Sequence, residues 1–202
     1  MTTQEFSIEF DILYNNLASN TAPPLNEYEK SVFLTKAQSD IVIELYSGRN
    51  NLGLSYESSE EVRNYLKGLL TFTEYTFTPS SNGLSQVPFP TWLMFITREE
   101  LNGDPVIPIS QDEYNRIKNN PFKGPNKNKV LAVSEEGSII LYSKYSINTF
   151  YIKYLKRPNP IVLDKSELKI NGVSEFNVEI PESLHNQVLY KAVQLAKVVW
   201  QS

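Results

Sequence analysis

The chain has 202 residues, no cysteine and one histidine, so it can bury a sizeable core but cannot form disulfides, and zinc or iron–sulfur sites lose their usual ligands. Its formal net charge of −4 argues against general nucleic-acid binding, so any DNA contact would have to be local. We expect no signal peptide and no membrane span, because the N-terminus carries acidic residues and no apolar run is long enough.

The N-terminal third predicts helices. Thr2 and Glu5 have capping-box spacing, which predicts a helix to about Ala18, although the alternating apolar residues of 6–12 also fit a strand. The second helix runs from the N-cap residue Asn26 to Gly48 along a continuous apolar stripe.

A third helix follows, for which Ser58 and Glu61 offer a further capping box. The connections between the three helices are short, which predicts an antiparallel arrangement.

From residue 71 the pattern becomes that of β-strands. We expect strands over 71–78 and 91–101, and the Asn102-Gly103 pair predicts a hairpin that returns through 106–109. Because proline lacks the donor that a sheet ladder needs, Pro105 and Pro108 place this returning strand at a sheet edge.

The next stretch combines a helix, a loop and a hairpin. Ser110 and Glu113 predict a helix from Gln111, which Asn119 to Pro121 should end. Residues 129–133 and 138–143 flank the hairpin connection of 134–137.

The remaining elements are less regular. A strand is predicted over 148–155, a short edge strand over 161–163, and a turn at 171–172 that leads into 174–180. Pro181 suits the start of a C-terminal helix whose broad apolar surface should pack on two sides. The second side belongs to a neighbouring subunit or to the core of the same chain.

These elements predict an α+β fold, in which N-terminal antiparallel helices and a C-terminal helix pack with an antiparallel, hairpin-rich sheet. We expect a single domain over residues 1–202, with a helical part of 1–70 and 182–202 and a β-rich part of 71–181.

Four segments resemble, in the same order, the head-tail connector and neck ring proteins of crAss-like bacteriophages. They are LNEYEKSVFLTKAQSDIVIELYSG at 25–48, WLMFITREEL at 92–101, QDEYNRIKNNPFKGPNKNKVLAV at 111–133 and LHNQVLYKAVQLAK at 184–197. None of them is a catalytic signature.

The resemblance implies a connector-like virion structural protein with no enzymatic activity and no cofactor. In this family, copies assemble into a ring below the portal vertex that connects capsid to tail. The implied partners are further copies of the chain in a cyclic homo-oligomer matched to a twelve-fold portal, the portal protein, adjacent neck or tail rings, and genomic DNA in the channel. The implied location is the virion neck or tail, after assembly in the host cytoplasm.

The candidate interface or DNA-facing residues are basic and lie between Glu113 and Glu135, where no acidic residue occurs. They are Arg116, Lys118, Lys123, Lys127 and Lys129. This segment contacts an acidic partner surface or DNA phosphates, or it is a solvated loop.

Other candidates for chemistry have simpler structural interpretations. We expect His185 to be a capping or surface residue and not a catalytic base. Glu99-Glu100 and Glu135-Glu136 are expected to be solvated turn residues and not an acid–base pair.

Three functions are therefore compared. A ring subunit needs two different complementary patches, which we place on residues 25–48 with the C-terminal helix and on residues 106–129. The alternative is a DNA-binding module that uses residues 116–129. An enzyme with a carboxylate-based site is the third hypothesis, and the sequence offers least support for it.

Overall fold

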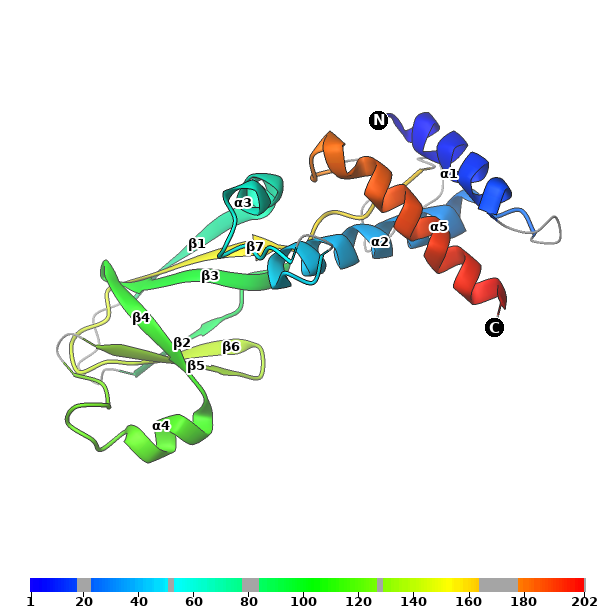
Figure 1. Ribbon diagram of the computed structural model, residues 1–202. Coiled ribbons are helices and arrows are strands. Elements are labelled where there is room, and N and C mark those ends of the chain that lie inside the picture. Colours follow the sequence, from blue (N-terminus) through cyan, green and yellow to red (C-terminus); the bar gives the residue numbers. More distant parts are fainter. Residues whose placement is uncertain (18–22, 51–52, 78–83, 127–128, 164–177, 202) are drawn as a thin grey trace. The chain divides into compact units, whose positions relative to one another are not determined.

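The computed structural model describes residues 1–17, 23–50, 53–77, 84–126, 129–163 and 178–201. They form an α+β fold, as predicted, and divide into a helical unit of Met1–Leu69 and Arg157–Ser202 and a β unit of Leu70–Lys156. Figure 1 labels the helices and strands of both units. Among the described residues, 157–163 and 178–180 fall in the helical unit by this division.

The helical unit contains α1 (Thr3–Leu17), α2 (Glu27–Ser47), α3 (Glu60–Leu66), the 3-10 turns η1 (Lys67–Leu69) and η2 (Glu182–Leu184), and α5 (His185–Gln201). The β unit contains β1 (Leu70–Thr76), β2 (Leu84–Pro88), β3 (Leu93–Leu101), β4 (Asp104–Ile109), α4 (Gln111–Ile117), β5 (Val130–Glu135), β6 (Ser138–Tyr142) and β7 (Thr149–Lys156).

The predicted capping residues fix the starts of α1 and α2. In α2 the Asn26 side chain accepts a hydrogen bond from the Glu29 amide at 2.8 Å, and the Glu29 carboxylate accepts one from the Asn26 amide at 2.9 Å. The helix ends at Gly48 in the left-handed conformation, with φ of 76°. Thr2 and Glu5 form the same reciprocal pair before α1.

The predicted cap of α3 was wrong by one residue. Ser59, not Ser58, accepts a hydrogen bond from the Val62 amide. The Ser58 hydroxyl instead accepts a hydrogen bond from the Ser55 amide at 2.9 Å, because the chain makes a turn immediately before the helix.

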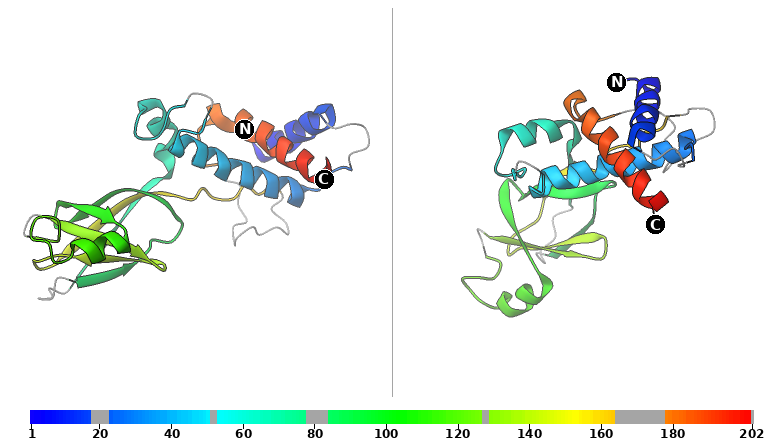
Figure 2. Two further views of the ribbon diagram at one scale, coloured as in Figure 1. Left: turned by 60° about the horizontal axis from the view of Figure 1, so that its bottom comes forward. Right: turned by 45° about the vertical axis from the view of Figure 1, so that its right-hand side comes forward.

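The core of the helical unit forms where α5 packs against both α1 and α2, which are in contact with each other as well. Figure 2 shows α5, in orange to red, alongside α2 in the left view and crossing it in the right view. The fully buried residues of this core include Phe6, Phe10, Leu34, Ala37, Val42, Val188, Leu189, Ala192 and Val193. The broad apolar surface of the last helix is thus covered largely within its own unit.

Residues 161–163 do not form the predicted edge strand. They are buried beside α2, whose side chains take the place of a neighbouring strand. The Leu163 amide donates to Ser31 Oγ at 3.0 Å, and the Ile161 amide donates to Thr35 Oγ1 at 3.0 Å. One turn further along, Gln38 Nε2 donates to the Asn159 carbonyl at 2.9 Å. The predicted turn at 171–172 and most of the strand over 174–180 lie outside the described residues.

The β unit is a curled seven-stranded sheet with the order β1-β7-β3-β4-β5-β6-β2. All neighbouring pairs are antiparallel except β4 and β5. Both predicted hairpins are confirmed, with positive φ at Asn102 and Gly103 between β3 and β4, and at Glu136 and Gly137 between β5 and β6.

The prediction that the proline-containing strand β4 lies at an edge was wrong. It stands between β3 and β5 in the middle of the sheet. Pairing with β3 extends only to Pro105, and the parallel pairing with β5 begins at Val106. Because β4 changes partner at this point, its later residues pair with a strand on one side only. Pro108 can therefore lie here, although it has no backbone N–H to donate.

The core of the β unit lies inside the curl. It contains Val87, Leu101, Val106, Val130, Ala132, Ile139, Leu141, Ile147, Phe150, Ile152 and Tyr154. The two edge strands are linked, because the Tyr75 hydroxyl at the end of β1 donates to the Pro88 carbonyl of β2 at 2.8 Å. This hydrogen bond holds opposite edges of the sheet around the common core.

Candidate interaction surface

The basic segment begins on α4, which is anchored to the sheet by few contacts. Ser110 Oγ accepts a hydrogen bond from the Glu113 amide at 3.3 Å, as predicted for its N-cap. The ring of Tyr114 stacks on that of Tyr142 in β6, with centroids 3.8 Å apart and planes 20° from parallel. None of the helix residues is fully buried, so α4 exposes most of its surface to solvent.

The loop after α4 is a well-defined turn. Asn120 Oδ1 accepts hydrogen bonds from the amides of Phe122 at 2.9 Å and Lys123 at 3.0 Å. The Gly124 amide donates to the Asn120 carbonyl at 2.8 Å. A Cβ at Gly124 would lie 2.8 Å from the carbonyl oxygens of Asn120 and Ile117, so only glycine fits without a shift of the backbone.

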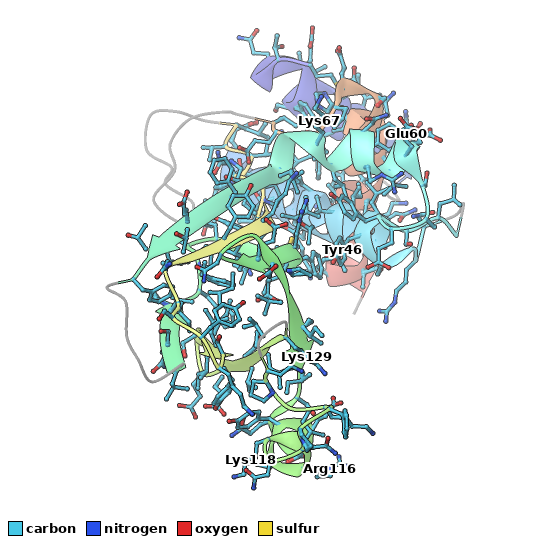
Figure 3. The ribbon with its side chains drawn as sticks, turned by 90° about the vertical axis from the view of Figure 1, so that its left-hand side faces the viewer. Tyr46, Glu60, Lys67, Arg116, Lys118 and Lys129 are labelled. Carbon is cyan, nitrogen blue, oxygen red and sulfur yellow. The ribbon has the colours of Figure 1, made fainter. Side chains whose placement is uncertain are left out.

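Four of the five predicted basic residues are described, and they lie along this segment. Arg116, Lys118 and Lys123 are exposed, and Lys129 is half-buried, with its Nζ donating to the Lys123 carbonyl at 2.8 Å. Figure 3 shows Arg116 and Lys118 at the end of α4. Lys127 lies outside the described residues. Lys129 thus supports the turn, while the other three present positive charge at the surface.

The high exposure of one aromatic residue in this segment was not predicted from the sequence. Phe122 follows Pro121 at the tip of the turn, and 87% of its surface is exposed. Its only signal in the sequence is an apolar side chain among polar and basic neighbours. Residues 118–124 form the Phe122 loop. This loop combines a hydrophobic side chain with two exposed lysines, Lys118 and Lys123.

The expectation that Glu99 is a solvated turn residue was wrong. It lies within β3 opposite Ile152, and only 8% of its surface is exposed. Burial raises the pKa of its carboxyl group to about 7. The neighbouring Glu100 instead forms an ion pair with Arg98. The alternating faces of the strand therefore place one carboxyl group toward the core and the other toward solvent.

His185 is also buried, so it is not a surface residue, although it stands at the C-cap of η2, one of the two expected roles. Its Nε2 lies 3.2 Å from the Ile180 carbonyl, and its ring lies 5.3 Å from that of Phe6. Burial lowers the pKa of the imidazole. The residue therefore packs the start of α5 against α1 and is not presented to a substrate.

The helical unit also carries a groove of about 480 Å³ between α2, α3 and α5. It is lined by Tyr65, Tyr190 and Arg49, and by an ion pair between Lys191 and Glu44. Across the described part of the chain, no cluster of three or more acidic, histidine or cysteine side chains is arranged to hold a metal ion. The described helices include none that is long and apolar enough to cross a membrane.

Comparison with known proteins identifies the family. The model of the phage tail ring protein 3/4 family matches residues 1–202, the whole chain. The chain belongs to this family. It is 40% identical to ring protein 3 of Bacteroides phage crAss001, with 97% of this chain and 95% of the relative covered. It is also 33% identical to ring protein 4/5 of the same phage, with 100% and 94% covered.

The resemblance to crAss-like phage ring proteins is thereby confirmed, and this ring protein is a structural component of the virion. Matches that extend over nearly the full length of both relatives include both units, so the Phe122 loop and the helices belong to the shared region.

Proposed function

We propose that this ring protein assembles with further copies of itself into a closed ring in the neck of the virion, where it connects capsid to tail. The observation that carries the proposal is the match of the entire chain to a ring protein family. Portal protein and adjacent rings are the proposed partners, with a ring matched to a twelve-fold portal. The role is structural and requires no catalytic site or cofactor.

A closed ring of identical subunits needs two different patches on each subunit, because every contact joins one surface to another. We propose residues 106–129 as one patch and the surface of residues 25–48 with α5 as part of the other. The support for the first patch is the Phe122 loop, in which three hydrogen bonds hold an exposed hydrophobic and basic surface in a defined shape. These contacts reduce the entropy lost when a partner binds.

Charge reversal tests the first patch. Changing Lys118 and Lys123 to glutamate should abolish ring formation by the purified chain, because the loop would then carry the opposite charge. The matched control changes Lys67 and Lys144, which are also exposed, and alters the net charge equally. Rings formed equally by both variants would exclude the loop from the interface.

The alternative function is binding of DNA through the same segment, favoured by the exposed Phe122 among basic residues. Such binding should weaken steeply as salt increases, with a slope set by the number of phosphates contacted. Titration of double-stranded DNA at several salt concentrations distinguishes the two functions, since the ring proposal requires no binding to DNA in the absence of assembly.

A further inference from the structure

The outer face of α1 is hydrophobic and acidic. Ile8 and Ile12 are 59% and 52% exposed and lie one helical turn apart. With 100° between successive residues, they project opposite to Phe6 and Phe10, which are fully buried against the rest of the helical unit. Within the described residues, nothing covers these two isoleucines.

Acidic residues accompany the isoleucines. The helix contains Glu5, Glu9 and Asp11 and no basic residue. Asp11 forms an ion pair with Lys30 of α2, with 2.7 Å between Lys30 Nζ and Asp11 Oδ2. Glu5 and Glu9 lie beside the isoleucines and one turn apart. The Glu5 carboxylate also caps the helix by accepting the Thr2 amide, so this face keeps negative charge that would attract a cation on a partner.

The Phe122 loop has the complementary composition. Phe122 is its exposed hydrophobic residue, and Lys118 and Lys123 are its exposed cations. The two surfaces thus match in hydrophobicity and are opposite in charge. They are also different surfaces of the subunit, as a head-to-tail contact requires.

We propose that the Phe122 loop of one copy docks on the α1 face formed by Glu5, Ile8, Glu9 and Ile12 of the next copy. Phe122 packs between the two isoleucines, and the lysines lie near the glutamates. This inference rests on the proposed ring function and names its subunit contact. A second copy fits better than DNA, because DNA phosphates would not account for the exposed isoleucines or the acidic charge of α1.

Photo-crosslinking from position 122 tests the contact directly. A benzophenone amino acid replaces Phe122 in the full-length chain, and irradiation is carried out on assembled protein with and without double-stranded DNA. We expect cross-links to residues 4–16 of a second copy. The control places the same amino acid at Phe72, which is 61% exposed on β1 of the same unit, and it should leave α1 unlabelled.

The outcomes separate this inference from the proposed function. Rings that cross-link elsewhere in a second copy, only to DNA, or not at all would overturn the contact while the ring function stands. A chain that forms no ring, either alone or with portal protein, would contradict both.

A double-mutant cycle gives an independent test. Phe122→Ser and Ile12→Ser should each weaken subunit association by at least about tenfold, as expected for a central hydrophobic contact. Together they should weaken it little more than either change alone, because both remove the same contact. Additive losses would overturn the pairing. Both positions are exposed, so folding should be retained, and circular dichroism checks this.

Discussion

The hydroxyl group of Thr35 bonds both backbone groups of Ile161. Its oxygen accepts a hydrogen bond from the Ile161 amide at 3.0 Å, and its O–H donates one to the Ile161 carbonyl at 3.4 Å. Ile161 and Val162 are fully buried, so their backbone groups need protein partners. A helix side chain thereby performs the role that a neighbouring strand has in a sheet.

Replacing Thr35 with valine keeps the shape of the side chain but removes this oxygen. The buried Ile161 amide then has no acceptor from α2, and we expect a loss of about 1–3 kcal/mol in the free energy of unfolding. Denaturant unfolding measures the loss, and Thr35→Ser, which retains the hydroxyl group, should lose much less. Equal stability of the valine variant and the original chain would show that this contact does not hold the segment.

Local signals predicted most of the fold. The capping pairs at Thr2 and Asn26 and the hairpin at Asn102-Gly103 depend on residues close in sequence, and each lies where it was expected. Apart from the cap of α3, which lies one residue from its predicted position, the failures arose where residues distant in sequence determine the structure. The apolar run 161–163 has the composition of a strand, and only the hydroxyl groups of Ser31 and Thr35 on α2 explain its actual structure.

The same distinction applies to the candidate surface. The clustering of basic residues after α4 follows from the sequence alone, because they lie on one short segment. The burial of Glu99 and His185 depends on which strand or helix covers them, and that was not visible in the local pattern. The exposure of Phe122 depends on the turn made by Asn120 and Gly124.

The buried carboxyl group of Glu99 should make the β unit less stable as pH rises. Below its ordinary pKa of 4.5 the group is protonated in both the folded and the unfolded chain. Between 4.5 and about 7 the unfolded chain ionises first, so the free energy of unfolding falls by roughly 3 kcal/mol in total. Hydrogen exchange of β-unit amides across this pH range measures the fall.

Glu99→Gln removes the titrating group and should flatten this pH profile. The control Glu74→Gln removes an exposed carboxyl group from β1 and should leave the profile as it is. If the Glu99 variant retained the full decline in stability, the decline would have another cause.

The buried His185 should act in the opposite direction on the helical unit. Its pKa is lowered from 6.5 by burial, so the unfolded chain takes up a proton at higher pH than the folded chain does. Stability present above pH 6.5 is therefore lost as pH falls. The free energy of unfolding of the original chain, taken relative to His185→Gln and measured by hydrogen exchange in α5, should stay level above pH 6.5 and fall as pH drops below 6.5. A relative free energy that does not change with pH would refute this assignment.

Gly124→Ala should disturb the Phe122 loop while leaving the sheet folded. The added methyl group would lie 2.8 Å from two backbone carbonyl oxygens, so the turn must open at a cost of about 1–3 kcal/mol. We expect faster hydrogen exchange at the amides of Lys123 and residue 124 and weaker ring formation. Asn119→Ala, at an exposed neighbouring position, is the control. Unchanged exchange in the Gly124 variant would contradict the close packing of this turn.

The native mass of the purified chain, measured across a range of concentrations, tests the central claim most directly. A closed ring predicts one discrete species at a whole-number multiple of the 23.1 kDa subunit, with no continuous series of larger assemblies. A chain that stays monomeric at every concentration, and that also fails to form a ring on purified portal protein, would contradict the account.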